Sequence, residues 1–160
     1  TLELSLEQAI GQDAEAGTAL KGNRNDNIFT LSGNKLKATG KGGANTYVIS
    51  GFSDSKSSDV IRDFNPGEGD RLAFDPSVIQ STEHDPLTFA VAVNKTEYKA
   101  LMQDAPVLIY REDNGHLFFD ANGSDDGLGD GGRLLRLKGA PELVGSDLFS
   151  LVELVAEPGV

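Results

Sequence analysis

The most chemically suggestive stretch of this sequence is an acidic run at residues 120–126. Oxygen-bearing side chains occupy alternate positions around a glycine there, as in many calcium-binding loops. These side chains belong to Asp120, Asn122, Ser124 and Asp126. Gly131 stands where an EF-hand would carry glutamate, so the run is not an EF-hand. Two interpretations stay open, a calcium site and a fully solvated acidic hairpin loop.

A second group of carboxylates consists of Asp59, Asp63 and Asp70. Asp59 and Asp63 are four residues apart, and side chains at that spacing face the same side of a strand. Three neighbouring carboxylates are a candidate calcium site. The structural alternative is that they cap turns and form ion pairs with Arg62 or Arg71.

The sequence offers little for enzymatic chemistry. Neither of its two histidines, His84 and His116, belongs to an HExxH motif, so a zinc site is not expected. Residues 51–55 resemble a nucleophile elbow, but they lack its second glycine and its α/β setting. The chain has no cysteine and therefore no thiol nucleophile. We expect a noncatalytic protein.

Composition narrows the possible partners. The chain has 160 residues and a net charge of −11, and 38% of its residues are hydrophobic, which is typical of one globular domain. Such an acid excess disfavours nucleic acid and anionic membrane surfaces, and it favours cations. No apolar stretch approaches the ~20 residues of a membrane helix, so membrane insertion is not expected.

Glycine and asparagine recur with a fixed period in the first third of the chain. A shift of 18 residues superposes residues 22–29 on residues 40–47, so that Phe29 meets Tyr47, and a poorer copy begins at Gly33. Eighteen residues are two nine-residue units, each a tight turn followed by a short strand. In a parallel β-roll two such units complete one coil, and residues 18 apart stack on the same edge.

Other segments predict ordinary strands and short helices. Residues 5–10, with Ser5 as N-cap, predict a short helix. Asn94 followed by Glu97 predicts a helix that extends to about Met102. Alternating or continuous apolar residues predict strands at residues 59–64, 71–74, 87–93, 106–111, 115–120, 132–137 and 147–152.

Four stretches together carry a family resemblance. They are residues 40–48, 59–70, 117–123 and 137–149, in that order. The chain resembles the hemolysin-type calcium-binding (RTX) family, and in particular the C-terminal β-roll and cap of type I secreted proteins such as the serralysin-type proteases. The resemblance spans about residues 22–151.

The resemblance implies a noncatalytic module that a type I ABC transporter exports unfolded from a bacterium, through an uncleaved C-terminal signal near residues 147–152. Outside the cell the module folds when it binds calcium. Extracellular calcium sites have dissociation constants of ~10⁻⁴–10⁻³ M, and a cation that binds only the folded chain stabilises it by mass action. The expected partners are calcium ions and the transporter, and the expected location is secreted.

The turns depart from the family pattern Gly-Gly-X-Gly-X-Asp. Asn27 and Asn45 stand where aspartate would hold calcium, and an amide provides an oxygen without charge. A shift of the first copy by one residue makes Asp26 the ligand instead. Lys35, in the middle copy, would repel a cation. We expect either a single weak calcium site or a calcium-free remnant held by asparagine ladders.

The predicted fold is all-β, a short degenerate parallel β-roll followed by an antiparallel β cap or sandwich, with one or two short helices. One module spans residues 1–160, with its lead-in, roll, cap and tail at residues 1–21, 22–50, 51–152 and 153–160. The predicted function is calcium-assisted extracellular folding and type I secretion of a larger bacterial protein. The alternative is a calcium-dependent adhesin that binds a surface glycan or protein through loops such as residues 120–130.

Overall fold

The computed structural model describes residues 8–10, 15–33, 35–51, 58–75, 78, 88–104, 108–121, 125, 127–128 and 131–150. Most of its regular structure is β. The strands are β1 (Gln8–Ile10), β2 (Ala19–Lys21), β3 (Asn27–Leu31), β4 (Lys37–Thr39), β5 (Thr46–Ile49), β6 (Asp59–Ile61), β7 (Arg71–Phe74), β8 (Phe89–Ala92), β9 (Leu108–Arg111), β10 (His116–Phe119), β11 (Gly132–Leu137) and β12 (Leu148–Ser150). The helices are α2 (Lys95–Leu101) and the 3₁₀ turns η1 (Pro66–Glu68) and η2 (Gly145–Asp147).

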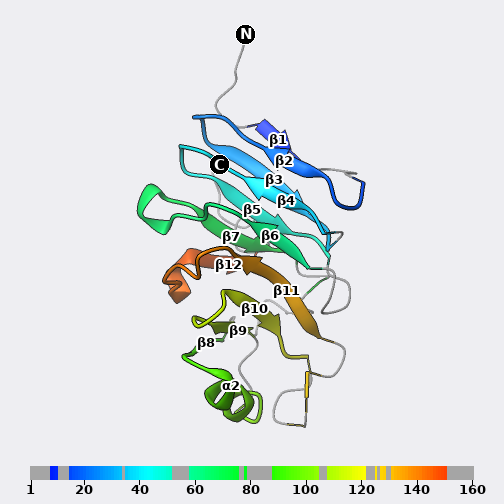
Figure 1. Cartoon of the computed structure of the whole chain (residues 1–160), viewed down its shortest axis with the longest axis vertical. Coiled ribbons are helices and arrows are strands. Elements are labelled where there is room, and N and C mark those ends of the chain that lie inside the picture. The colour runs from blue at the N-terminus through cyan, green and yellow to red at the C-terminus, as the bar shows by residue number, and fades with distance from the viewer. Residues whose placement is uncertain are drawn as a thin grey trace, which may run out of the picture.

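The strands form two sheets that the chain builds alternately (Figure 1). One sheet has the order β1-β3-β5-β7-β12, and the other has the order β2-β4-β6-β11-β10-β9-β8. From β2 to β7, consecutive strands therefore belong to opposite sheets. Five or six residues separate β2 from β3, β3 from β4 and β4 from β5, whereas nine separate β5 from β6 and β6 from β7.

Pairing between β3 and β5 confirms the predicted 18-residue superposition. The two strands are parallel, and Phe29 lies opposite Tyr47. In the other sheet β2 and β4 are also parallel, with Leu20 opposite Ala38 at the same offset. Larger offsets separate β5 from β7 and β4 from β6, because longer turns connect those strands.

The predicted antiparallel cap is only partly antiparallel. Antiparallel pairing joins β10 to β9 and to β11. The remaining pairs in this part of the chain are parallel, namely β6 with β11, β7 with β12, and β8 with β9. Alternation of apolar residues shows that a segment is a strand, but it does not reveal the partner or the direction of pairing. β11 and β12 therefore extend the two sheets that the first strands began.

The predicted helix at residues 5–10 is wrong where the structure describes it. Gln8–Ile10 is strand β1, which pairs in parallel with β3. A helix of one or two turns is marginal in water, whereas the edge of β3 offers this segment a row of backbone partners.

The second predicted helix is confirmed as α2. The side chain of Asn94 accepts a hydrogen bond from the N–H of Glu97 (2.9 Å), and the Glu97 carboxylate accepts one from the N–H of Val93 (3.2 Å). These bonds satisfy donors that a helix N-terminus leaves unpaired. No helix in the described ranges is long and apolar enough to span a membrane.

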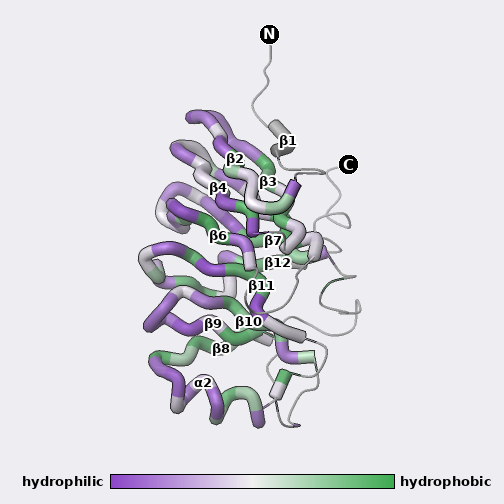
Figure 2. Tube along the Cα trace, turned by 45° about the vertical axis from the view of Figure 1, so that its right-hand side comes forward, coloured by the Kyte–Doolittle hydropathy of each residue, from purple (hydrophilic) through white to green (hydrophobic). Residues whose placement is uncertain are grey.

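The core lies between the two sheets. Figure 2 shows the hydrophobic segments along the strands and largely hydrophilic turns on the left of the view. Phe29 stacks on Tyr47 with ring centroids 4.9 Å apart, and Phe64 packs against Tyr47 at 5.9 Å. Other fully buried core residues are Leu31, Leu36, Ala38, Ile49, Ile61, Leu72, Phe74, Leu108, Tyr110, Leu117, Leu134, Leu135 and Leu137.

Two buried tyrosines differ in the state of their hydroxyl groups. The Tyr110 hydroxyl donates to the carbonyl of Pro141 (2.6 Å). The Tyr47 hydroxyl is buried and has no hydrogen-bond partner. A buried polar atom without a partner lowers stability.

The same substitution should therefore have opposite effects at these two sites. In calcium-free buffer, we expect Tyr47→Phe to raise the free energy of unfolding by about 1 kcal/mol, because it removes an unpaired hydroxyl. Tyr110→Phe should lower it by about 1 kcal/mol, because it leaves a carbonyl without its donor. Urea denaturation of both variants measures this. Equal losses of stability in the two variants would contradict the assignment of the Tyr47 hydroxyl.

Candidate functional site

Side-chain oxygens from successive turns line up along one edge of the molecule. The Asn45 amide oxygen accepts from the N–H of Asn27 (2.8 Å), and Asp70 Oδ1 accepts from the N–H of Asn45 (2.8 Å). The Asn27 amide oxygen accepts from the N–H of Asn23 (2.8 Å). We call Asn27, Asn45 and Asp70 the turn ladder. Its side chains are almost wholly buried, with exposures of 1%, 0% and 1%.

Glycines make room for the turn ladder. A Cβ at Gly40 would collide with the Tyr47 hydroxyl and the Asn45 amide. Gly43 has φ of +84°, and a Cβ there would lie 2.5 Å from the carbonyl oxygen of Asn25. The glycine-rich composition of these turns thus reflects both close packing and left-handed backbone.

Asp70 is the one charged member of the turn ladder. Burial raises the pKa of its carboxyl above the ordinary value. The N–H groups of Asn45 and Asn65 act in the opposite direction, and the second of these donates to Asp70 Oδ2 at 2.9 Å. The nearby charges of Asp63 and Glu68 raise the pKa further. The ionised carboxylate at this edge is therefore a place where a cation would be favourable.

Asp59 is buried and holds a turn at the opposite edge. Its Oδ2 accepts from the N–H of Gly33 (2.7 Å), and its Oδ1 accepts from the N–H of Leu36 (2.8 Å). This carboxylate therefore ties β6 to the turn that precedes β4 in the neighbouring coil of chain.

Asp63 holds the turn at the other end of β4. Its two oxygens accept from the N–H groups of Gly40 and Lys41, both at 2.8 Å. Strand β6 ends at Ile61, so the same-side rule for residues four apart does not extend to Asp63. The structure brings Asp63 near Asp70 and leaves Asp59 at the far end of β4.

Asp26 makes the same kind of bond from an exposed position. One of its oxygens accepts from the N–H of Ala44 (2.8 Å), 18 residues later in the chain. Asp26 therefore lies at the same edge as the turn ladder. Asp59, Asp63 and Asp70 cap turns, which is one half of the structural alternative from the sequence. The other half, ion pairs with Arg62 or Arg71, is not seen for Asp63 or Asp70 in the described part of the chain.

The Tyr47 hydroxyl also lies at this edge, and the sequence analysis did not predict that position. Burial raises the pKa of Tyr47, and so do the charges of Asp70 and Asp63. An unpartnered oxygen thus lies close to two carboxylates. The position was predicted to be apolar core, because it matches Phe29 in the repeat. Only the hydroxyl that distinguishes tyrosine from phenylalanine could have pointed to it.

The acidic run lies mostly outside the described residues. Asp120 follows β10 and is buried, with 4% exposure. Asn122, Ser124 and Asp126 are not described, and neither is His84. The two open interpretations of this run remain predictions.

His116 lies on β10 among cationic side chains. Its Nε2 is 3.3 Å from Nη1 of Arg133. Burial, followed by the charges of Arg133, Arg136 and Arg111, lowers the pKa of His116 to about 4. At neutral pH the imidazole is therefore uncharged and accepts a hydrogen bond from the guanidinium.

Two of the family-like stretches meet at one pocket of about 490 Å³. Asn65, Pro66 and Gly67 line one wall, and the other wall is formed by Pro141, Glu142, Val144 and Asp147. The two walls lie more than 70 residues apart in the sequence, which shows that these stretches are neighbours in space.

Comparisons with family models, curated proteins and solved structures found no match to this chain. Within the described part of the chain, no three histidine or acidic side chains form a group that could hold a metal ion. The observations that bear on function are therefore the turn ladder and its neighbouring carboxylates.

Matched substitutions of two aspartates test the role of these bonds. Asp59→Ala removes the acceptor of two buried N–H groups, so we expect the free energy of unfolding to fall by about 2–4 kcal/mol. Asp26→Ala removes one exposed bond, and the loss should be below about 1 kcal/mol. Chemical denaturation of both variants gives the comparison. Equal losses of stability in the two variants would show that burial of the hydrogen bonds to Asp59 does not increase their contribution.

Proposed function

We propose that this chain is a noncatalytic module of the hemolysin-type calcium-binding kind, in which calcium assists folding outside the cell. In this proposal the two alternating sheets are a short β-roll. The observation that carries it is the turn ladder, in which oxygens of Asn27, Asn45 and Asp70 line up at successive turns. A stack of equivalent turns with oxygens along its edge is what a calcium-binding roll requires.

The side chains near the turn ladder fit a cation in part. Asp63 and Asp70 supply two carboxylates, and the Tyr47 hydroxyl supplies an oxygen without a hydrogen-bond partner. Each carboxylate oxygen already accepts one N–H, but it has a second lone pair available. Calcium takes six to eight oxygen ligands, so turn carbonyls and water must complete the shell. A weak site is expected.

Charge also supports export before folding. The net charge of −11 opposes compaction of a chain that lacks bound cations. Calcium is scarce inside cells and abundant outside, so a module stabilised by calcium stays export-competent until it leaves. The larger protein and its transporter are part of this proposal.

Calcium should raise the melting temperature by a few degrees. At millimolar calcium a site with a dissociation constant of ~10⁻⁴–10⁻³ M adds about 0.4–1.4 kcal/mol, which corresponds to roughly 1–5 °C for a chain of this size. The measurement is circular dichroism during heating, in chelator and in calcium. Identical melting curves would contradict the calcium part of the proposal.

A charge variant sharpens this experiment. Asn27→Asp with Asn45→Asp restores the family's carboxylates, so it should melt lower in chelator and gain more from calcium than the natural chain does. The control, Asn94→Asp with Asn114→Asp, adds the same charge at positions where aspartate can accept the same N–H bonds. The control should respond to calcium as the natural chain does.

Export is tested separately, in a bacterium that carries a type I exporter. Deletion of residues 147–160 from the parent protein should leave it inside the cell, because the proposed signal is lost. The control is Asp59→Ala, which weakens the folded state and leaves those residues intact. It should be exported normally, since export precedes folding. Undiminished export of the deletion variant would refute the secretory role.

A further inference from the structure

The seven-stranded sheet carries an unexpected excess of basic residues. Five residues within its strands are basic, and one, Asp59, is acidic. Two more basic residues directly follow strands of this sheet. The basic residues are Lys21, Lys37, Arg111, Arg133 and Arg136, and those that follow strands are Arg62 and Lys138. They are half of the 14 lysines and arginines in a chain of net charge −11.

These side chains share the outer face of the sheet. Each strand alternates a core residue with an exposed one, as in β2, where Leu20 is buried and Lys21 is exposed. In the same way Ala38 is buried beside Lys37, and Leu135 is buried beside Arg136. Successive side chains of a strand point to opposite faces, so the basic residues point away from the core. Lys21, Lys37, Arg62, Arg136 and Lys138 are all exposed.

Strand register arranges the charges in two rows. In the first row Lys37 lies across from Val60, which in turn lies across from Arg136. This row continues through His116 to Arg111.

The second row begins with Lys21, opposite Thr39. It continues with Arg62 and Lys138, whose N–H groups bond to Ala38 and Ile61 of the preceding strands. In the first row a charge falls on every second strand, a spacing of about 10 Å.

A β-bulge adds Arg133 to this face. Arg133 and Arg136 are three residues apart and would point to opposite sides of a regular strand. The register shifts between Leu117 and Phe118, so that Arg136 pairs with His116 and Arg133 pairs with Phe118. Since His116 and Phe118 share a face, both arginines point outward beside them.

The positive charge of this face is mostly uncompensated. Arg133 donates to the Ser58 hydroxyl (2.8 Å) and contacts His116, and both partners are neutral. Burial, and then the charge of Arg136, lower the pKa of Arg133. In the described ranges the one ion pair of this face joins Arg111 to Asp113.

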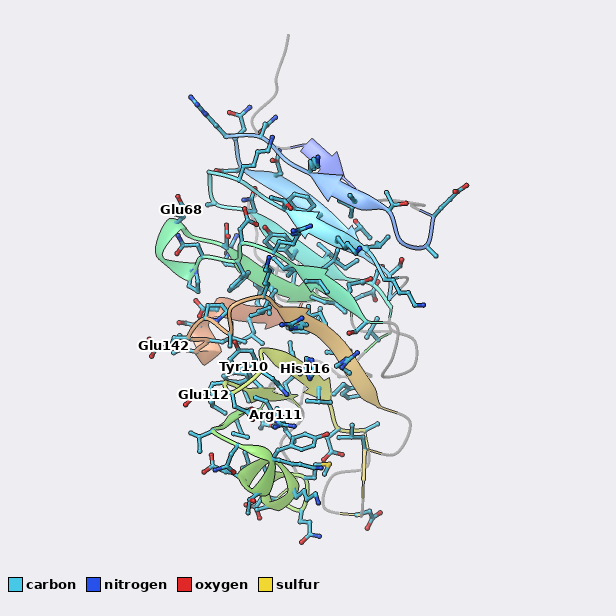
Figure 3. The ribbon with its side chains drawn as sticks, viewed as in Figure 1. Glu68, Tyr110, Arg111, Glu112, His116 and Glu142 are labelled. Carbon is cyan, nitrogen blue, oxygen red and sulfur yellow. The ribbon has the colours of Figure 1, made fainter. Side chains whose placement is uncertain are left out.

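Among the described residues, most acidic side chains lie in turns and loops and not on the strands of this sheet. In Figure 3, Glu68, Glu112 and Glu142 lie at turns on the left of the view, whereas Arg111 and His116 lie on strands. The carboxylates of Asp59, Asp63 and Asp70 are bonded to backbone N–H groups of turns. A polyanion on the outer face would therefore meet cations across several strands, which we call the basic sheet face (Lys21, Lys37, Arg62, Arg111, Arg133, Arg136 and Lys138).

We propose that the basic sheet face binds an extended acidic polysaccharide whose sugars carry carboxylate groups. Arginine and lysine pair well with carboxylates. The open part of the face spans β2, β4, β6 and β11, because beyond β11 Tyr98 of α2 packs on Phe118 and Arg111 at the same face. The sparse charge spacing suits a polymer with isolated carboxylates better than a nucleic acid, since duplex DNA carries a charge every ~1.7 Å of its length. The acidic remainder of the protein would also repel a duplex that extends beyond the face.

Titration calorimetry with de-esterified polygalacturonate tests the proposal. We expect the natural chain to bind this polymer at about 50 mM salt, to bind it more weakly as salt rises, and not to bind neutral dextran. Absence of polygalacturonate binding would overturn the proposal.

Two triple variants with the same net charge locate the site. Lys37→Gln, Arg136→Gln and Lys138→Gln together remove three exposed charges of the basic sheet face, and binding should weaken roughly ten-fold. The control combines Arg24→Gln, Lys35→Gln and Lys41→Gln, which are exposed and lie in turns outside the strands, and its affinity should stay within about two-fold of the natural value. Lys37→Gln alone should weaken binding by about two-fold, and it provides a single exposed change if the triple variant does not fold.

The remaining outcomes also decide the matter. Equal loss in the two triple variants would overturn the proposal, since it would show that the net charge of the protein controls binding rather than the basic sheet face. Binding of single- or double-stranded DNA more tightly than polygalacturonate, with the same dependence on the basic sheet face, would assign the surface to nucleic acid instead. If light scattering shows that the triple variant of the basic sheet face loses self-association and nothing else, the basic sheet face would be assigned to contact with a second copy of the chain. The triple variant of the basic sheet face should show the same rise in melting temperature with calcium as the natural chain. This result would keep the test of polysaccharide binding separate from the test of the proposed function.

Discussion

Hydrogen bonds from turn N–H groups to side-chain oxygens are the constraint on which this arrangement depends. Parallel strands satisfy one another's backbone groups, but the turns between them leave N–H groups that must find acceptors when they are buried. Asn45 and Asp70 each supply such an acceptor to the preceding turn, and Asp59 supplies two. A lost acceptor of this kind leaves a buried donor unpaired, at about 1–3 kcal/mol. These side chains therefore hold each turn in place against the next one.

The same oxygens connect folding to the proposed binding of calcium. An amide oxygen accepts an N–H without bringing a charge into the buried edge, so Asn27 and Asn45 keep the turns together in the absence of a cation. Asp70 does bring a charge, and its raised pKa records what burial and the neighbouring carboxylates do to it. A ladder with two amides and one carboxylate can therefore hold its shape alone, with a modest further gain from a cation. In the proposed function, calcium would therefore add only modestly to the stability of such a chain.

The sequence predicted those parts of the fold that depend on residues close together in the chain. The repeat gave the parallel pairing of β3 with β5, because residues on the same edge of successive coils face the same surroundings and so have similar types. The capping residues of α2 gave that helix, since the bonds involved span only a few residues. The strand β1 and the parallel placement of β11 and β12 were missed. Their partners lie up to 76 residues away, and nothing in a short apolar segment records which edge it will meet.

The candidate site was predictable in its residue types and less so in its geometry. Asn27 and Asn45 were singled out from the repeat, and Asp70 was singled out in a separate group of carboxylates; the structure places all three at one edge. Asp59 was grouped with Asp63 by the rule for strands, but β6 ends before Asp63 and the two carboxylates hold opposite ends of β4. The Tyr47 hydroxyl was hidden by its match to phenylalanine in the repeat. A rule that places side chains from their spacing in a strand is thus valid only for residues that lie within that strand.

The separation of charges follows from the same constraint. A turn that needs acceptors can use aspartate or asparagine, but it cannot use lysine or arginine, since neither accepts a hydrogen bond. Carboxylates therefore gather where the chain changes direction. Long basic side chains are compatible with strand positions that face water, where their stems cover the sheet and their charges stay solvated. The net charge of −11 is thus the sum of an acidic edge and a basic face, and it does not represent the charge of either surface. A partner that meets the molecule meets one of these surfaces, so the sum of charges excludes fewer partners than composition alone suggests.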